Sequence, residues 1–202
     1  MQTSKRKKQT RKQLDFYART FRIRAPYQVL CDANFVHAFL KNKLGTRLEE
    51  LHGLVSTALD TNQVKLLLCE SSLGEIDELF GKESELYQLA RGMETIRCGR
   101  DEQESNSIPP QVAMRKLVGN GLNRRGYFVA TQDDELKEHF RTVPGVPLLY
   151  IQRQLLLMDA PSESSVRFEA QQAQKKLKVP KSERKRLEPV APPPSSKRVK
   201  RM

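Results

Sequence analysis

Three acidic residues, Asp32, Glu75 and Asp133, each follow an apolar run closely along this chain. The three runs span residues 27–31, 64–68 and 127–131. Each run is typical of a buried strand, and the carboxyl ends of parallel strands meet at one edge of an open α/β sheet. Two carboxylates about 4 Å apart repel by roughly 4 kcal/mol at an effective dielectric constant of about 20, so a shared site favours a neutralising cation. The pattern therefore predicts a site for a magnesium or manganese ion.

The elements that must position these acids alternate between strands and helices. Apolar residues at helical spacing predict further elements, namely helices over 5–20, 34–41, 47–59, 83–93, 111–118 and 163–177, and a helix that starts beside Asp133. Another strand is expected over 147–151, and an edge strand or hairpin over 155–158. Alternating strands and helices predict an α/β sandwich with a mainly parallel sheet.

The acids also have simpler explanations as helix-start residues. Ser72 precedes Glu75 by three positions, which is the spacing of a capping box. Asp133, Asp134 and Glu135 stand where a helix is expected to begin, and a helix N-terminus stabilises negative charge. The spacing alone leaves the choice between helix starts and a cation site open.

The positive charge of the chain is concentrated at its two ends. Residues 1–24 carry nine Lys or Arg against one Asp, and residues 161–202 carry twelve against four Glu, so each end has a net charge of +8. Residues 25–160 have a net charge of −4. We therefore divide the chain into a basic N-terminal arm or helix (1–24), a folded domain (25–160) and a basic, partly helical and partly disordered tail (161–202).

Such basic ends are typical of arms that bind a polyanion, most often nucleic acid, because each neutralised phosphate releases a counterion. The alternative is a solubilising tail that carries a nuclear import signal. We expect nucleic-acid contact, and the residues assigned to it are Lys5, Arg6, Lys7, Lys8, Arg11, Lys12, Lys175, Lys176, Lys178, Arg184, Lys185 and Arg186.

Cysteine spacing and hydropathy restrict the class of protein further. Cys31, Cys69 and Cys98 lie far apart with no histidine at metal-binding spacing, so neither disulfides nor a zinc site is expected. Cys31 and Cys69 fall in apolar strands, where we expect them to be buried. No stretch approaches the ~18 apolar residues that cross a bilayer, and the basic N-terminus lacks the apolar core of a signal peptide, so we expect a soluble intracellular protein.

Four segments of the chain resemble the PIN-domain proteins of the eukaryotic small-subunit processome. They are residues 29–35, 75–76, 129–133 and 141–148, and the Pro-Gly-Val-Pro sequence in the last is the most specific. Residues 11–21 and 26–30 are similar to one branch, the nucleolar rRNA-processing proteins paralogous to the processome's PIN endonuclease. The resemblance runs from about residue 5 to about residue 160. It implies a PIN-like three-layer fold, to which a basic N-terminal helix and an extended C-terminal tail are added.

The resemblance also implies a set of site residues. In PIN nucleases, acidic side chains hold one or two divalent ions that activate a water for attack on a phosphodiester. The corresponding ligands of magnesium or manganese here are Asp32, Glu75 and Asp133, with Glu135 at the fourth acidic position. Asn34 matches the Asn of the Asp-x-Asn motif, and Thr131 matches the hydroxyl residue before the third acid. Glu135 is longer than the usual Asp, which can displace a metal ligand.

The chain departs from this branch at its zinc-binding insert. Cys98 keeps one ligand position, but Arg100 stands where a His is expected and Ala113 stands near where a Cys is expected. A single ligand cannot hold zinc. We therefore expect no zinc, and a mobile surface loop over residues 99–110 in its place.

The resemblance leads to two functions that share one fold. We expect an RNA-binding assembly factor of the nucleolar small-subunit processome that binds pre-rRNA and small nucleolar RNA in early pre-rRNA processing and 18S rRNA maturation. It would act beside other processome proteins, as a monomer within a large ribonucleoprotein particle in the nucleus and nucleolus. The alternative is an active divalent-metal-dependent PIN endoribonuclease that cleaves pre-rRNA. A phosphatase is disfavoured because residues 32–34 lack a second Asp, and a dinucleotide-binding protein because no Gly-x-Gly-x-x-Gly run follows a strand.

Overall fold

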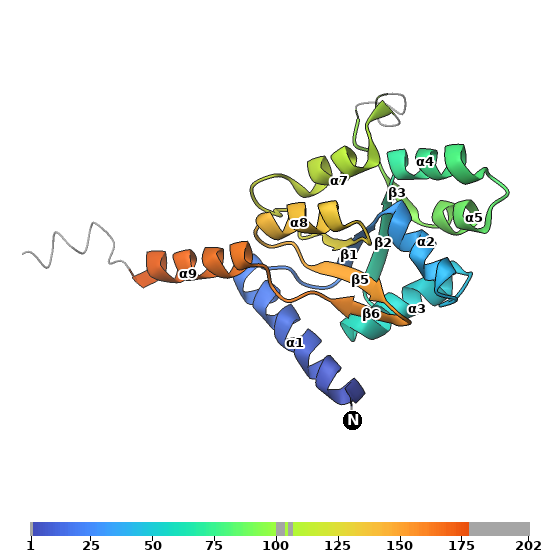
Figure 1. Ribbon diagram of the computed structural model, residues 1–202. Coiled ribbons are helices and arrows are strands. Elements are labelled where there is room, and N and C mark those ends of the chain that lie inside the picture. Colours follow the sequence, from blue (N-terminus) through green and yellow to red (C-terminus); the bar gives the residue numbers. More distant parts are fainter. Residues whose placement is uncertain (1, 100–103, 105–106, 178–202) are drawn as a thin grey trace, which may run out of the picture. The chain divides into compact units, whose positions relative to one another are not determined.

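The computed structural model describes residues 2–99, 104 and 107–177 (Figure 1). The chain divides into two units, residues 1–169 and 170–202, and the architecture described here is that of the first. Of the second unit, the structure describes the end of the last helix, up to Leu177. The proline-rich part of the tail and Lys178, Arg184, Lys185 and Arg186 lie outside the described residues.

A six-stranded sheet forms the centre of the first unit, in the order β3-β2-β1-β4-β5-β6. The strands are β1 (Tyr27–Cys31), β2 (Val64–Cys69), β3 (Glu94–Ile96), β4 (Phe128–Ala130), β5 (Leu148–Gln152) and β6 (Leu155–Met158). The first five are parallel, and β6 runs antiparallel to β5 at the edge. The predicted α/β class with a mainly parallel sheet is confirmed.

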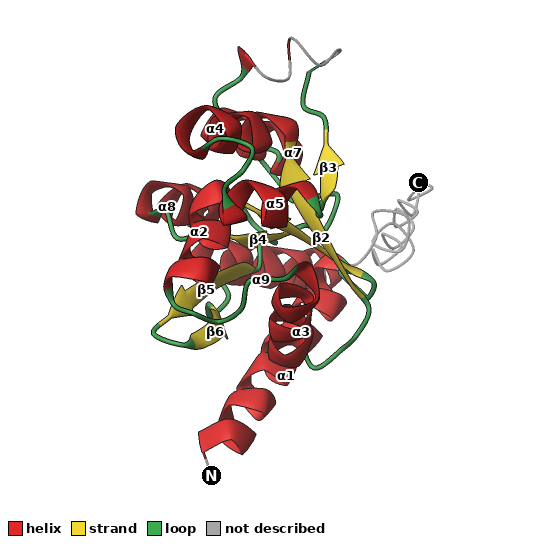
Figure 2. Ribbon diagram, turned by 90° about the vertical axis from the view of Figure 1, so that its right-hand side faces the viewer, coloured by secondary structure: helices red, strands yellow, loops and turns green. Residues whose placement is uncertain are grey.

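Helices cover both faces of this sheet (Figures 1 and 2). They are α1 (Gln2–Phe21), α2 (Ala33–Lys41), α3 (Leu48–Leu59), α4 (Glu70–Phe80), α5 (Glu85–Arg91), α7 (Pro110–Val118) and α8 (Asp134–Thr142). The last helix, α9 (Glu163–Leu177), begins in the first unit and ends in the second. None of the described helices is both long enough and apolar enough to cross a membrane.

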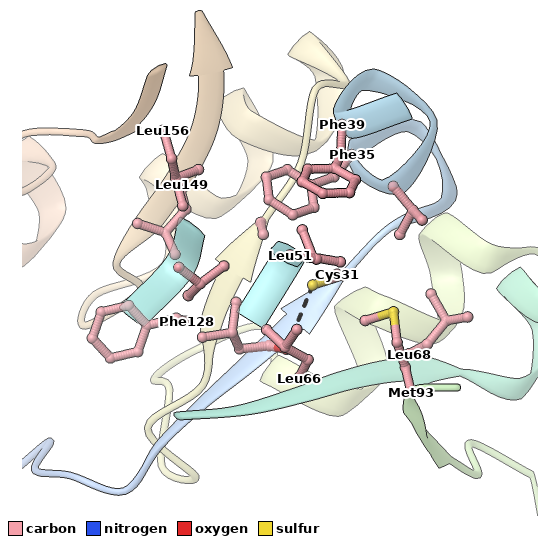
Figure 3. Close-up of a cluster of buried hydrophobic side chains, with 14 of the residues drawn as sticks. Cys31, Phe35, Phe39, Leu51, Leu66, Leu68, Met93, Phe128, Leu149 and Leu156 are labelled. Atoms are coloured by element: carbon pink, nitrogen blue, oxygen red, sulfur yellow. Dashed lines mark hydrogen bonds between the residues drawn. The ribbon is translucent and has the colours of Figure 1, made fainter. Parts of the chain in front are cut away.

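Two apolar clusters fill the space between the sheet and its helices. Successive strand residues point to opposite faces, so Val29 and Cys31 of β1 belong to one cluster, whereas Leu30 belongs to the other. The first cluster, drawn in Figure 3, takes Phe35 and Phe39 from α2 and further side chains from α1, α3, α4 and α5. The second joins β1, β2, β4 and β5 to α7 and α8. Because each face of the sheet is covered in this way, the domain has three layers.

The C-terminal half of α1 belongs to the folded body. Tyr17 is buried, and Leu14, Phe16 and Phe21 pack against the first apolar cluster. The Tyr17 hydroxyl donates a hydrogen bond to the Val146 carbonyl over 3.3 Å. The apolar side of this helix therefore docks on its own domain, while Lys5 to Lys8 remain exposed to solvent.

The structure corrects the expected elements between residues 69 and 96. Helix α4 begins at Glu70 with Cys69 as its N-cap, so Ser72 lies inside the helix and forms no capping box with Glu75. The helix expected over 83–93 is shorter, since α5 ends at Arg91, and the sequence continues into β3. Strand β3 escaped prediction because it has three residues, of which Glu94 and Thr95 are exposed.

Candidate functional site

The carboxyl ends of β1 and β4, together with α4, bring the predicted acids to one pocket of about 260 Å³. Asp32, Asn34, Glu75 and Asp133 all line it. The remaining lining residues are Ala33, Pro109, Pro110, Gln111, Met114 and Leu136. Parallel pairing explains part of this convergence, because β1 pairs with β4 in register from Val29 and Phe128 to Cys31 and Ala130. Asp32 and Asp133 therefore leave neighbouring strands at the same edge of the sheet.

Asp32 lies at the base of this pocket and is 4% exposed. It is the N-cap of α2, and its Oδ1 accepts the Phe35 backbone N–H over 2.5 Å. Its Oδ2 accepts a hydrogen bond from the Thr131 hydroxyl. Burial raises the pKa of Asp32 to about 7, these two hydrogen bonds lower it, and the charges of Asp133 and Glu75 add to the rise. The three acids thus interact electrostatically, as a shared site requires.

Asp133 is the N-cap of α8, as the helix-start explanation proposed. Its Oδ1 accepts the backbone N–H groups of Glu135 over 2.8 Å and Leu136 over 3.2 Å. Its Oδ2 accepts a hydrogen bond from Nε2 of Gln111 on α7 over 2.9 Å. Capping therefore accounts for Oδ1 of Asp133. Its Oδ2 contacts Gln111, which the sequence did not predict as a site residue. The periodicity that predicted α7 gave no signal that Gln111 faces the acids, because this contact joins segments 22 positions apart.

The other predicted site residues are arranged around these two acids. Thr131 is fully buried and links the two acids, since its hydroxyl accepts the Asp133 backbone N–H over 3.0 Å. Glu75 is exposed in the middle of α4, and Asn34 is exposed in the first turn of α2. Glu135 is exposed on α8 and is absent from the residues that line the pocket.

The pocket suits a hard divalent cation in the type of its ligands. Carboxylate and amide oxygens are the ligands that magnesium and manganese prefer. In the present side-chain positions, however, no three His, Cys, Asp or Glu residues of the described chain are close enough to hold a metal ion. Both oxygens of Asp32 and both of Asp133 already accept hydrogen bonds from this chain. A carboxylate has about four lone-pair sites, so these hydrogen bonds leave both side chains able to bind a cation after small shifts.

The segment around Cys98 is described in part. The Cys98 Sγ lies 3.3 Å from the Ala113 carbonyl oxygen, and burial raises the pKa of this thiol to about 11. Arg100 and most of the loop expected over 99–110 lie outside the described residues. Cys31 and Cys69 are fully buried in their strands, as predicted.

The predicted RNA contacts lie in both terminal segments. Those on α1 are exposed, and they are Lys5, Arg6, Lys7, Lys8, Arg11 and Lys12. Lys7 forms an ion pair with Asp60 over 3.5 Å, in which both side chains are about half exposed. Lys175 is exposed near the end of α9, and the side chain of Lys176 lies outside the described ones. The α1 residues thus form a cationic row that solvent and a polyanion can reach.

The fold and this acidic pocket together define a PIN-like α/β domain. A solved structure of the PIN domain endonuclease Utp24 is similar to it, with a TM-score of 0.53 and 21% identity over 66% of this chain and 92% of the other. The sequence model of the Fcf1 family matches residues 59–160, which is half of the chain. The chain belongs to the Fcf1 family.

Curated relatives agree with this assignment. The rRNA-processing protein utp23 of Schizosaccharomyces pombe is 31% identical over 80% of this chain, which spans 59% of that relative's length. The rRNA-processing protein FCF1 of Saccharomyces cerevisiae is 30% identical over 64% of this chain and 62% of its own. Its human homologue is 27% identical over 67% of this chain and 63% of its own. The chain therefore spans about three fifths of the length of these relatives.

Proposed function

We propose that this protein is an RNA-binding assembly factor of the small-subunit processome that acts in early pre-rRNA processing and 18S rRNA maturation. Membership of the Fcf1 family carries this proposal, because the relatives of both names are called rRNA-processing proteins. The exposed cationic row on α1 supports it, since Lys and Arg side chains that reach solvent can neutralise phosphates. The proposed ligands are pre-rRNA and small nucleolar RNA.

The cellular setting follows from the same proposal. A factor that matures pre-rRNA acts where the RNA is made, so we place the protein in the nucleus and the nucleolus. Its partners are other processome proteins, and it acts as one copy within a large ribonucleoprotein particle. The folded domain carries a net charge of −4 against +8 at each end, so RNA contact is concentrated in the terminal segments.

The acidic pocket is compatible with a binding factor. The oxygens of Asp32 and Asp133 accept hydrogen bonds within the chain, which hold the strand ends and helix starts together. These bonds do not exclude a cation, because each carboxylate has about four lone-pair sites. The acids then have a structural role that does not depend on turnover.

An endoribonuclease is the second candidate, and the shared pocket of Asp32, Asn34, Glu75 and Asp133 favours it. Asp32, Glu75 and Asp133 would hold magnesium or manganese, and such an ion activates water for attack on a phosphodiester. In this candidate Asn34 helps to place the RNA backbone, Thr131 keeps Asp32 oriented, and Glu135 turns towards the ion from the start of α8.

Asp133→Asn separates the two candidates. Asn is as good an N-cap as Asp, so α8 keeps its start, while the pocket loses a charged ligand. For the binding factor we expect normal 18S rRNA processing in cells and unchanged RNA affinity, measured by northern analysis of pre-rRNA and by fluorescence anisotropy. Loss of a manganese-dependent cleavage activity together with an 18S defect would instead establish the nuclease. Asp134→Asn, next to it on the exposed side of α8, is the matched control.

A further inference from the structure

We propose that a groove between α1, α3 and β6 binds an acidic, leucine-containing segment of a protein partner in an extended conformation. The α1–β6 groove has a volume of about 200 Å³. It is lined by Arg6, Lys7, Gln9, Thr10 and Gln13 of α1, Thr57 and Ala58 of α3, and Leu155, Leu156, Leu157 and Met158 of β6. None of these residues lines the acidic pocket.

The sequence of α1 explains why this groove stays open. Tyr17 and Phe21, in the C-terminal half of α1, pack on the domain. Further towards the N-terminus, the α1 residues that line the groove are all polar or charged, so no apolar side chain of this helix fills it. Gln13 binds the Asp159 carbonyl oxygen over 3.2 Å and so fixes the helix at one end of the groove. Beyond that anchor, Leu155 of β6 remains 42% exposed.

The floor of the groove favours an extended peptide. Strand β6 pairs with β5 on one side and is the last strand of the described sheet. An edge strand with partly exposed leucines is the kind of surface to which an extended segment adds, since backbone hydrogen bonds give affinity and apolar side chains give specificity. Helices α1 and α3, which lie side by side in Figures 1 and 2, form the other walls of the groove.

The charge around the groove determines which peptide fits. Six Lys or Arg and no acid occur in residues 1–12, and Arg6 and Lys7 form part of the groove wall. Asp60 pairs with Lys7, but both side chains are about half exposed, and such a pair contributes little. The wall therefore attracts a polyanion, either an acidic peptide or RNA.

The aliphatic floor distinguishes these two polyanions. Single-stranded RNA is held by aromatic side chains on which its bases stack, and the groove is lined by leucine, methionine and alanine without an aromatic ring. Leucine side chains of a peptide can bury this floor, while neighbouring glutamates reach Arg6 and Lys7. RNA phosphates are then bound by the outer cations of α1, such as Lys8 and Lys12.

Fluorescence anisotropy with the full chain tests this proposal. The probe is a short labelled peptide in which glutamate and leucine alternate, and the comparison peptides replace leucine by serine or glutamate by lysine. We expect the first peptide to bind at least about tenfold more tightly than either of the others. Leu155→Glu, which places a carboxylate on the floor, should weaken its binding by about tenfold or more.

Two control variants match the test variants in chemistry. Leu79→Glu changes a leucine that is 70% exposed on α4, away from the groove, and should leave peptide binding unchanged. Arg6→Glu should weaken peptide binding, whereas Lys41→Glu makes the same change in net charge on α2 and should have little effect. Circular dichroism establishes that each variant is folded.

RNA binding is measured on the same proteins with a labelled oligouridylate. Leu155→Glu should change this affinity by less than about twofold, because a leucine side chain offers a phosphate neither a positive charge nor a hydrogen-bond donor. If Leu155→Glu weakens RNA as much as peptide, the groove is an RNA site and the proposal is wrong. Equal binding of the leucine and serine peptides would also overturn it. Since peptide binding is measured without RNA, neither result depends on the function in rRNA processing.

Discussion

At the residue level, Asp32 combines two roles that oppose each other. Its oxygens cap α2 and accept the Thr131 hydroxyl, which stabilises the fold. The same burial raises its pKa to about 7, so the charged form is disfavoured below about pH 7. Asp32 is therefore a position where stability and the capacity to hold a cation conflict, because the ionised form that a cation needs is the costly one.

Asp32→Asn should remove the pH dependence that this conflict creates. The folded-state pKa is raised, so the stability contributed by protonated Asp32 is complete below its ordinary pKa of 3.8 and is lost as the pH rises through about 7. Relative to the variant, the free energy of unfolding of the wild type should fall by up to roughly 4 kcal/mol between about pH 4 and about pH 8. Urea unfolding in a chelating buffer measures this difference.

Asp15→Asn is the control for this measurement, because Asp15 is exposed on α1. Its unfolding curves should stay parallel to those of the wild type across the pH range. Parallel curves for Asp32→Asn would show that the carboxylate is ionised in the folded protein at neutral pH.

At the level of elements, the Pro-Gly-Val-Pro segment joins parts of the chain that are distant in sequence. The Gly145 backbone N–H donates to the Ser165 hydroxyl over 2.9 Å, and its carbonyl accepts the Asn123 side-chain amide over 2.7 Å. Gly145 has φ +82°, and a Cβ there would lie 2.6 Å from the Phe21 ring of α1. In this segment, which is the most specific part of the family resemblance, the left-handed backbone and the nearby Phe21 ring therefore require glycine at position 145.

Gly145→Ala should destabilise the protein by about 2–4 kcal/mol, because the left-handed backbone costs about 1–2 kcal/mol and the clash with Phe21 adds to it. Phe21 cannot easily move, since its ring stacks on Phe168 with centroids 5.2 Å apart. Thermal and urea unfolding measure the loss. Gly121→Ala is the matched control, because no atom lies within 4 Å of its Cβ position, and it should change stability little. Equal effects of the two substitutions would refute this account of Gly145.

At the level of the whole molecule, the two terminal arms are positively charged and the folded domain between them is negatively charged. The ends carry +8 each and the domain carries −4, so the proposed RNA contact and the acidic pocket depend on different parts of the chain. The structure shows where the N-terminal arm can be cut. Gln13 of α1 is buried and apolar packing begins at Leu14, whereas residues 5–9, 11 and 12 are exposed.

Deletion of residues 1–12, or of residues 175–202, should weaken RNA binding and flatten its dependence on salt. Each lost phosphate contact reduces the slope of log affinity against log salt by about 0.7 for a single strand. Anisotropy titrations at several salt concentrations measure this slope, and unchanged slopes would exclude contact between the arms and phosphates. A variant with Lys41→Glu and Lys43→Glu controls for net charge, because it lowers the charge outside the arms.

The sequence by itself determined the local elements and the class of the domain. Apolar periodicity is a short-range property, so it located β1, β2, β5 and most helices, and it placed Asp32 and Asp133 at strand ends. It also allowed two explanations of Asp133. The helix-start explanation is confirmed because Asp133 caps α8, whereas the cation site stays a prediction, although Asp133 lines the pocket. The capping-box explanation of Glu75 was wrong, because α4 starts before Ser72.

What only the tertiary structure decided were contacts between segments far apart in sequence. The hydrogen bonds of Asp32 with Thr131 and of Gln111 with Asp133 join different elements, as does the docking of α1 on the domain. The α1–β6 groove likewise exists because three separate elements enclose it. Residue types and spacing fix which side chains can meet at a strand end, but packing of the layers decides which hydrogen-bond donors each carboxylate oxygen meets, since those donors come from elsewhere in the chain.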